Sequence, residues 1–360
     1  MSSGGNIQGE GLYGCTFIPP LKCKPNTIQS LTLSDEEPLS KQLSKIIIKE
    51  DAEIEFAISK IIHKIPLYKN YFAVSEIICE PNSQQKDKNL DHCPLLDHTP
   101  LSQTRLLTMP FAGKQLNEVQ FNVRTFDLMN FITHLISAGA LLNLFGIVHR
   151  DLHQGNILID LHNIPRIIDF NLSILTRSTY LDASMISHKY EYKISQEPPD
   201  STLVNAITHQ YKPLDVIHSI CYKKPIIKKI SALLGISTKD MYNSLYQFYR
   251  KSKSVKDGDL VKWFKLYYRT IDSWAIGITI VDLIRKMSLW TSFSDILQKH
   301  KSKLFPLLRK MCAVNPLERI DCVQALHYLD PNHFIIRKYG KQWLSVVGDY
   351  SKPFSSISTV

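Results

Sequence analysis

The stretch HRDLHQGNILIDLHNIPRIIDFNLS, residues 149–173, constrains the fold of this chain more than any other part of it. Two short apolar runs, Ile157–Ile159 and Ile167-Ile168, flank a polar segment that contains a proline. Apolar runs separated by a polar turn are typical of a β-hairpin. We therefore expect a hairpin that brings Asn156 and Asp169 together at one of its ends.

The polar residues around this hairpin have the spacing of a phosphoryl-transfer centre. His149-Arg150-Asp151-Leu152 followed by Asn156 matches the pattern HRDLxxxN, and Asp169 precedes Phe170 further along. Phosphoryl transfer from ATP needs carboxylate and amide groups to hold metal ions, and a carboxylate near the acceptor hydroxyl. We predict that Asp151 accepts the hydroxyl proton and that Asn156 and Asp169 bind Mg²⁺.

On these residues the chain resembles the eukaryotic-type protein kinase superfamily. It is most similar to the divergent serine/threonine kinases of large DNA viruses such as iridoviruses. That likeness rests on a glycine-rich segment running into Pro19-Pro20-Leu21-Lys22-Cys23, on Leu43-Ser44-Lys45, and on a long insert. The resemblance implies an α+β, bilobal protein-kinase fold with ATP and Mg²⁺ as cofactors, and transfer of the γ-phosphate to protein serine or threonine hydroxyls.

The resemblance also implies a domain organisation. We expect a β-rich N-lobe over residues 1–108 and a helical C-lobe over residues 109–345, with a basic helical insert at about 205–268. Residues 346–360 are polar and read as a flexible tail.

Several residues of the expected N-lobe would bind ATP. Gly9, Gly11 and Gly14 fall on GxGxxG, a pattern that lets the backbone approach phosphates. The phosphate-binding lysine is Lys45 or Lys49, which we expect on one face of an extended strand; the resemblance favours Lys45. Its carboxylate partner would come from a helix starting near Asp51. Glu55 fits the helical spacing of the following isoleucines better than Glu53 does.

The segment LTMPFAGKQL, residues 107–116, resembles the connector between the two kinase lobes. The resemblance implies that Met109 is the gatekeeper of the adenine site. It also implies that the Pro110 carbonyl and the Ala112 amide bind adenine. Proline at position 110 keeps the carbonyl that this role needs.

Three further residues resemble structural positions of protein kinases. Asp200, in Pro198-Pro199-Asp200, would pair with Arg319, and Asp272, in DSWAIG, would support the backbone of the catalytic loop. Small-molecule kinases of the aminoglycoside and choline type generally lack these elements.

Two positions depart from the kinase pattern. His153 replaces a lysine that normally contacts the transferring phosphate, and a histidine is cationic only part of the time near neutral pH. We include His153 among the catalytic residues and expect slower or differently tuned transfer. Asn171 replaces the glycine after Asp169-Phe170, and asparagine tolerates positive φ better than most residues. We expect a less mobile loop there. A phosphate on the 172–197 segment could bind Arg150.

The positive charge of the chain is concentrated in one segment. Residues 223–269 hold 12 Lys or Arg against 3 Asp or Glu, whereas the whole chain has a net charge of +10. The segment reads as helical, with eight aromatic residues among its lysines. We expect most of these aromatics to pack inside a helical subdomain, and the charge suggests a possible acidic protein partner or nucleic acid.

The remaining features bear on location and on rival functions. Seven cysteines without CxxC spacing read as reduced thiols in a cytoplasmic protein, working in a host cell or carried in a virus particle. The longest apolar run is too short to span a bilayer, and we expect a monomer. Two rival functions stay open: a small-molecule kinase, suggested by the Asp-Leu-His spelling, and a catalytically silent scaffold acting through the basic insert.

Overall fold

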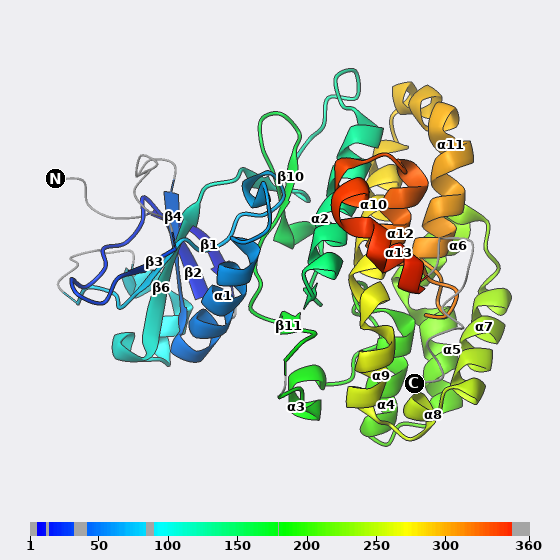
Figure 1. Cartoon of the computed structure of the whole chain (residues 1–360), viewed down its shortest axis with the longest axis horizontal. Coiled ribbons are helices and arrows are strands. Elements are labelled where there is room, and N and C mark those ends of the chain that lie inside the picture. Colours follow the sequence, from blue (N-terminus) through cyan, green and yellow to red (C-terminus); the bar gives the residue numbers. More distant parts are fainter. Residues whose placement is uncertain (1–5, 12–13, 32–41, 84–89, 179, 348–360) are drawn as a thin grey trace. The chain divides into compact units, whose positions relative to one another are not determined.

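The computed structural model of the chain describes residues 6–11, 14–31, 42–83, 90–178 and 180–347. The chain is of the mixed α+β class and divides into two compact units (Figure 1). The first unit comprises residues 1–114, 158–162 and 166–173; the second comprises 115–157, 163–165 and 174–360. Most of the tail expected over 346–360 lies outside the described residues, since helix α13 ends at Val347.

The first unit is built on an antiparallel six-stranded sheet with the strand order β1-β2-β4-β6-β5-β3. Its strands are β1 (Asn6–Gly11), β2 (Gly14–Ile18), β3 (Gln29–Ser30), β4 (Gln42–Ile48), β5 (Ile77–Cys79) and β6 (Thr104–Pro110). Helix α1 (Lys49–Ile62) follows β4 directly and packs against β4, β5 and β6. The sheet and this helix position the side chains of the first half of the candidate site.

Successive residues of a strand point to opposite faces, so this sheet has two apolar layers. Ile46 and Leu106 face one layer, which also contains Phe17, Leu90 and Leu95. Their neighbours Ile47 and Leu107 face the other layer, where Ala52 and Phe56 of α1 cover the sheet. Lys45 directly precedes the buried residues Ile46 and Ile47 in β4, and its own side chain is only partly buried.

Two disulfides lie in the first unit, which contradicts the expectation that all seven cysteines are reduced thiols. Cys15 bonds to Cys93, and Cys23 bonds to Cys79. The spacing rule failed because each bond joins cysteines 78 or 56 residues apart, which only the folded sheet and the following loop bring together. The three free cysteines, Cys221, Cys312 and Cys322, are all buried.

The predicted hairpin is present. Strands β9 (Ile157–Ile159) and β10 (Pro165–Ile167) are neighbours in a three-stranded sheet with the order β10-β9-β7, where β7 is Lys114–Gln115. A further two-stranded sheet pairs β8 (Ile147–Val148) with β11 (Ile174–Leu175).

The second unit is mainly helical. Its helices are α2 (Leu128–Leu144), α3 (Ala183–Ile186), α4 (Pro199–Thr208), α5 (Pro213–Lys223), α6 (Pro225–Leu234), α7 (Thr238–Lys251), α8 (Lys253–Lys256), α9 (Leu260–Tyr267), α10 (Ile271–Met287), α11 (Thr291–Met311), α12 (Cys322–Leu329) and α13 (Lys341–Val347). Helix α10 is buried along most of its length and packs against α2, α6 and α11 (Figure 1). Asp272 of this buried helix accepts from the backbone of the loop that precedes β9.

Short helical turns complete the two units. They are η2 (Tyr68–Asn70), η3 (Leu90–His92), η4 (Pro94–Asp97), η5 (Leu101–Gln103), η6 (Gln154–Asn156), η7 (Tyr268–Thr270) and the π-helical η8 (Ile336–Gly340).

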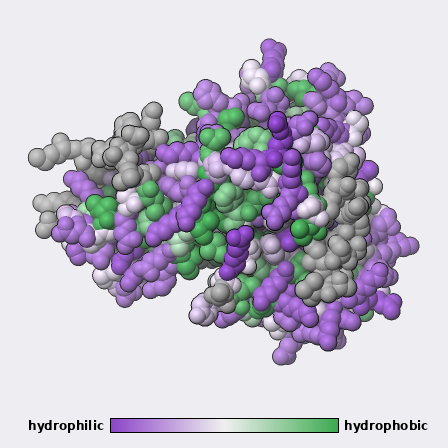
Figure 2. Space-filling model, in the orientation of Figure 1, coloured by the Kyte–Doolittle hydropathy of each residue, from purple (hydrophilic) through white to green (hydrophobic). Residues whose placement is uncertain are grey.

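The basic segment forms helices α6 to α9, where helices were expected. Of its eight aromatic residues, Phe248, Trp263, Phe264 and Tyr267 are buried, and the other four are partly buried. Its lysines are mostly exposed, but Lys224 is fully buried. Hydrophilic residues cover much of the face of the molecule that Figure 2 shows. No helix among the described residues is both long and apolar enough to cross a membrane.

Candidate active site

The first unit brings together three of the predicted site residues. The Lys45 Nζ atom lies 3.0 Å from Glu55 Oε2 and 2.7 Å from Asp169 Oδ1. Lys45 comes from β4, Glu55 from the second turn of α1, and Asp169 from the chain after β10. One ammonium group therefore links residues from three separate segments of the chain.

The charges of this trio support one another. Burial on its own would lower the pKa of Lys45, but Glu55 and Asp169 outweigh it and raise the pKa above its ordinary value. Burial raises the pKa of Glu55, and Lys45 opposes that effect. The Asp169 side chain is 30% exposed, whereas that of Glu55 is 3% exposed. Asp169 is thus the carboxylate that solvent and a ligand can reach.

The alternative lysine and glutamate lie elsewhere. Lys49 is the first residue of α1, not the end of an extended strand, so the helix begins two residues earlier than expected. Its side chain points toward Glu53 at 3.9 Å in an exposed i,i+4 pair. Such surface pairs contribute little to stability. The expectation that Lys45 and Lys49 share one strand face was wrong.

The backbone at Asp169 adopts a left-handed conformation with φ of 65°. Such a conformation costs a non-glycine residue roughly 1–2 kcal/mol. The sequence suggested positive φ at Asn171, but Asn171 is not among the described residues that have it. The left-handed turn therefore occurs at the residue whose carboxylate contacts Lys45, and it directs that side chain.

The glycine-rich segment forms a hairpin between β1 and β2, with Gly11 paired opposite Gly14 and Gly9 opposite Thr16. Gly14 must be glycine, because a Cβ atom there would collide with the Ile46 carbonyl and the Ile47 side chain. The tip of this hairpin, residues 12 and 13, lies outside the described residues.

The predicted connector residues lie at the end of β6 and just beyond it. Met109 is buried and pairs with Leu43 of β4, and Pro110 pairs with Gln42. Ala112 is buried in a small apolar cluster with Ala73, Leu158 and Ile168.

The second unit holds the loop over residues 149–156, whose backbone Asp272 supports as predicted. The N–H groups of His149 and Arg150 donate to Asp272 Oδ2 and Oδ1 at 2.8 and 3.0 Å. Asp272 is fully buried, which raises its pKa, while these donors oppose the shift. Arg150 has a φ of 70°, a second left-handed non-glycine residue at the site.

Asp151, His153 and Asn156 lie together in this loop. The Asn156 Nδ2 atom donates to the Asp151 carbonyl at 2.9 Å and to Asp151 Oδ2 at 3.3 Å. The Gly155 N–H donates to His153 Nδ1, so the neutral imidazole carries its proton on Nε2. That Nε2 lies 3.7 Å from Asp151 Oδ2. Because Asn156 donates through its nitrogen, its side-chain oxygen is the atom that could bind a cation.

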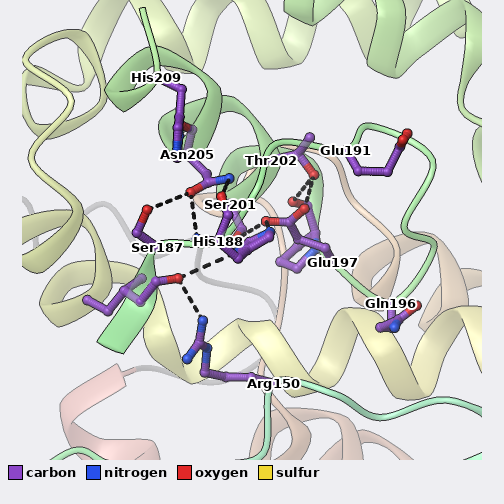
Figure 3. A network of polar contacts seen from close by, with 12 residues as sticks. Arg150, Ser187, His188, Glu191, Gln196, Glu197, Ser201, Thr202, Asn205 and His209 are labelled. Carbon is purple, nitrogen blue, oxygen red and sulfur yellow. Dashed lines mark hydrogen bonds and ion pairs between the residues drawn. The ribbon is translucent and has the colours of Figure 1, made fainter. Parts of the chain in front are cut away.

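The segment after β11 is held by a polar network (Figure 3). Arg150 donates to the Met185 and Ile186 carbonyls at 2.6 and 2.7 Å. Asn205 of α4 donates to the His188 carbonyl, and His188 pairs with Glu197 at 3.1 Å. The guanidinium of Arg150, which we expected to bind a phosphate on this segment, is occupied by main-chain carbonyls.

Asp200 and Arg319 form the predicted ion pair, at 2.7 Å between Asp200 Oδ1 and Arg319 Nη2. Both side chains are fully buried. Asp200 Oδ2 also accepts from the Trp263 indole at 3.1 Å.

Sequence reasoning missed two side chains at the site, Gln196 and Lys224. Gln196 Nε2 donates to Asp151 Oδ1 at 3.0 Å, and Lys224 Nζ donates to the Glu197 carbonyl at 2.7 Å. No motif identifies a glutamine 45 residues from its partner. A lysine directly before the proline that starts a helix was the available signal for Lys224, but it reads as one more surface charge.

No protein-family model matches the chain, and no curated protein is similar to it. Within the described residues, no group of three or more His, Cys, Asp or Glu side chains is arranged to hold a metal ion. Mg²⁺ that is held by one or two protein oxygens together with phosphate oxygens does not require such a group.

Proposed function

We propose that the chain is an ATP-dependent protein kinase that transfers the γ-phosphate of Mg-ATP to serine or threonine hydroxyls of proteins. The observation that carries this proposal is the Lys45 ammonium group bound by both Glu55 and Asp169. A lysine held by a helix glutamate, beside a partly exposed aspartate, is the arrangement that kinases use to orient ATP phosphates. The bilobal kinase fold, with the first unit as N-lobe and the second as C-lobe, is part of the proposal.

The residues present suit these cofactors. Carboxylate and amide oxygens, here Asp169 and Asn156, are the hard ligands that Mg²⁺ prefers. In this role the metal neutralises charge on the transferring phosphate. Gly9, Gly11 and Gly14 would cover the phosphates, and Met109, Pro110 and Ala112 would contact adenine. Lys45, held by Glu55, would bind the phosphates through its permanent charge.

The acceptor side belongs to the second unit. Asp151 would orient the acceptor hydroxyl and take its proton, and His153 would donate from Nε2 in place of the usual lysine. Asp272 would keep the loop that carries both residues in place. The rival small-molecule kinase rests on His153 alone, whereas the Asp200–Arg319 pair and the Asp272 contacts favour a protein kinase.

A partner and a location complete the proposal. The exposed lysines of residues 223–269 would attract an acidic protein or a nucleic acid, and retention on heparin that falls with salt would support this. Two disulfides are rare in cytosolic proteins. They favour the virus particle over the host cytoplasm as the place where the protein works.

The test is transfer of label from γ-labelled ATP to a generic protein substrate with magnesium, beside Asp151→Asn and Asp169→Ala. Label on protein that both substitutions abolish supports a protein kinase. Binding of Mg-ATP without transfer to protein would favour a small-molecule acceptor. If the chain does not bind ATP, the remaining function would be that of a catalytically silent scaffold that acts through the basic insert.

A further inference from the structure

The carboxylate of Asp151 is held on both of its oxygens. Oδ1 accepts from Gln196 Nε2 at 3.0 Å. Oδ2 accepts from Asn156 Nδ2 at 3.3 Å and lies 3.7 Å from His153 Nε2. The shortest contact therefore comes from a residue outside the catalytic loop. Donors on both oxygens stop the carboxylate from rotating about its terminal bond.

The main chain is clamped on either side of Gln196. The Ser195 carbonyl accepts from the Trp274 indole of α10 at 3.0 Å, and the Glu197 carbonyl accepts from Lys224 Nζ at 2.7 Å. Both Trp274 and Lys224 are fully buried. Two carbonyls fixed by buried donors leave the intervening residue little freedom, so the Gln196 side chain is presented to Asp151 in one orientation.

The Glu197 side chain adds a third anchor. Its carboxylate accepts from the hydroxyls of Ser201 and Thr202 in the first turn of α4, at 2.9 and 3.0 Å, and pairs with His188 (Figure 3). The segment before α4 is thus tied to the helix that follows it. Lys224 is also 3.4 Å from the Thr202 hydroxyl, so it joins the same network.

Lys224 is an unusual residue to find here. Its complete burial lowers its pKa to about 8, and the nearby Glu197 and Asp200 carboxylates offset only part of that effect. Burying a cation is unfavourable unless its contacts compensate. An apolar side chain of similar length could be buried without that penalty, so the contact with the Glu197 carbonyl is what a lysine adds.

We propose that Gln196 is a positioning residue for Asp151, and that Lys224, from the basic insert, holds Gln196 in register. This inference rests on the proposed function, because it gives Asp151 its role in phosphoryl transfer. Fixing a reacting group in its productive orientation raises the rate of the chemical step. The insert then has a function inside the molecule as well as a charged surface.

The experiment compares wild type, Gln196→Met and Lys224→Met. Methionine keeps the length of either side chain and removes its donor. Gln247→Met, on the exposed face of α7, is the matched control. Two quantities are measured for each variant: kcat and the KM for ATP in phosphoryl transfer from Mg-ATP.

We expect kcat to fall about 10- to 100-fold in Gln196→Met and in Lys224→Met, with the KM for ATP unchanged. An active enzyme whose kcat is unchanged by Gln196→Met would overturn this inference alone. A faster Gln196→Met enzyme would also overturn it, because Gln196 would then compete with the acceptor. A wild type that binds Mg-ATP and transfers no phosphate to protein would reject the proposed function, and with it the positioning role of Gln196.

Discussion

Two ion pairs of the molecule have the same length but lie in very different surroundings. Lys45–Asp169 in the first unit and Arg319–Asp200 in the second both measure 2.7 Å. The first pair has side chains 13% and 30% exposed, whereas those of the second are 0% exposed. The distance between the charged atoms therefore does not distinguish a pair that could bind a ligand from a purely structural pair. The exposure of the side chains does distinguish them.

The difference in access sets what each pair can do. A partly exposed carboxylate beside a charged lysine can exchange that contact for a metal ion or a phosphate. A fully buried pair cannot exchange its contact for one with a ligand. It stabilises the fold because neither charge is then buried without a partner of opposite charge. Substitutions should therefore affect activity at the first pair and stability at the second.

Asp169→Asn gives the largest expected effect on activity. We expect the rate of phosphoryl transfer to fall at least about 100- to 10,000-fold, because the amide keeps the shape of the side chain and loses its charge. The free energy of unfolding should change by less than about 0.5–1 kcal/mol, since the side chain is partly exposed. Labelled transfer and urea unfolding measure the two quantities. A large loss of stability would mean that the Lys45 pair is structural like the other.

Arg319→Met gives the largest expected effect on stability. We expect the free energy of unfolding to fall by about 3–5 kcal/mol, because the Asp200 carboxylate is left buried without its partner. The matched control is the double variant Asp200→Asn/Arg319→Met, whose neutral amide can still accept from the Trp263 indole. Urea unfolding should show much of the loss recovered in the double variant. No recovery would mean that the arginine acts through its three other hydrogen bonds instead of through charge.

The disulfides give an intermediate effect confined to the first unit. Replacement of Cys15 and Cys93 by alanine should lower the free energy of unfolding by about 2–4 kcal/mol, because the bond closes a long loop. Wild type with dithiothreitol should lose at least as much, since Cys23–Cys79 is then reduced too. Alkylation and mass spectrometry before reduction should find only Cys221, Cys312 and Cys322 modifiable, and only after unfolding. Seven modifiable thiols after unfolding without a reductant would contradict the bonds.

Local patterns predicted most of what local physics controls. The hairpin of β9 and β10 and the helices of the insert follow from spacing and apolar periodicity, whereas the likeness to kinases suggested the contacts of Asp272. The Asp200–Arg319 pair joins residues 119 apart, and only the likeness to kinases suggested it. The same likeness favoured Lys45 over Lys49. Periodicity alone could not choose between them, because it did not identify the position at which strand β4 ends and helix α1 begins.

The missed features share one physical cause. The Cys15–Cys93 bond, the Gln196–Asp151 contact and the burial of Lys224 depend on segments distant in sequence that pack side by side. Lysine side chains usually lie at the surface, and a single glutamine belongs to no recognisable spacing pattern. Such contacts become visible only when the three-dimensional arrangement is known.

The pair of His188 and Glu197 joins a partly exposed side chain to a buried one, and its loss should give the smallest effect. The hydrogen bond with Glu197 raises the pKa of His188. Burial would raise the pKa of Glu197, but His188 and Lys224 outweigh it and lower that pKa. The stabilisation is therefore fully present below the ordinary histidine pKa of 6.5 and is lost as pH rises through the raised value. At the acid end it is lost as pH falls through the lowered pKa of Glu197.

His188→Gln should thus cost under about 1 kcal/mol near pH 6, since the imidazole is about a third exposed, and almost nothing near pH 9. Urea unfolding at the two pH values measures the difference. In a Glu197→Gln background the same substitution should no longer cost more near pH 6 than near pH 9, because the imidazolium then has no carboxylate partner. An equal cost at both pH values in the wild-type background would mean that His188 stabilises the fold by packing. This partly exposed pair would then be a structural contact, like the fully buried pair of Asp200 and Arg319.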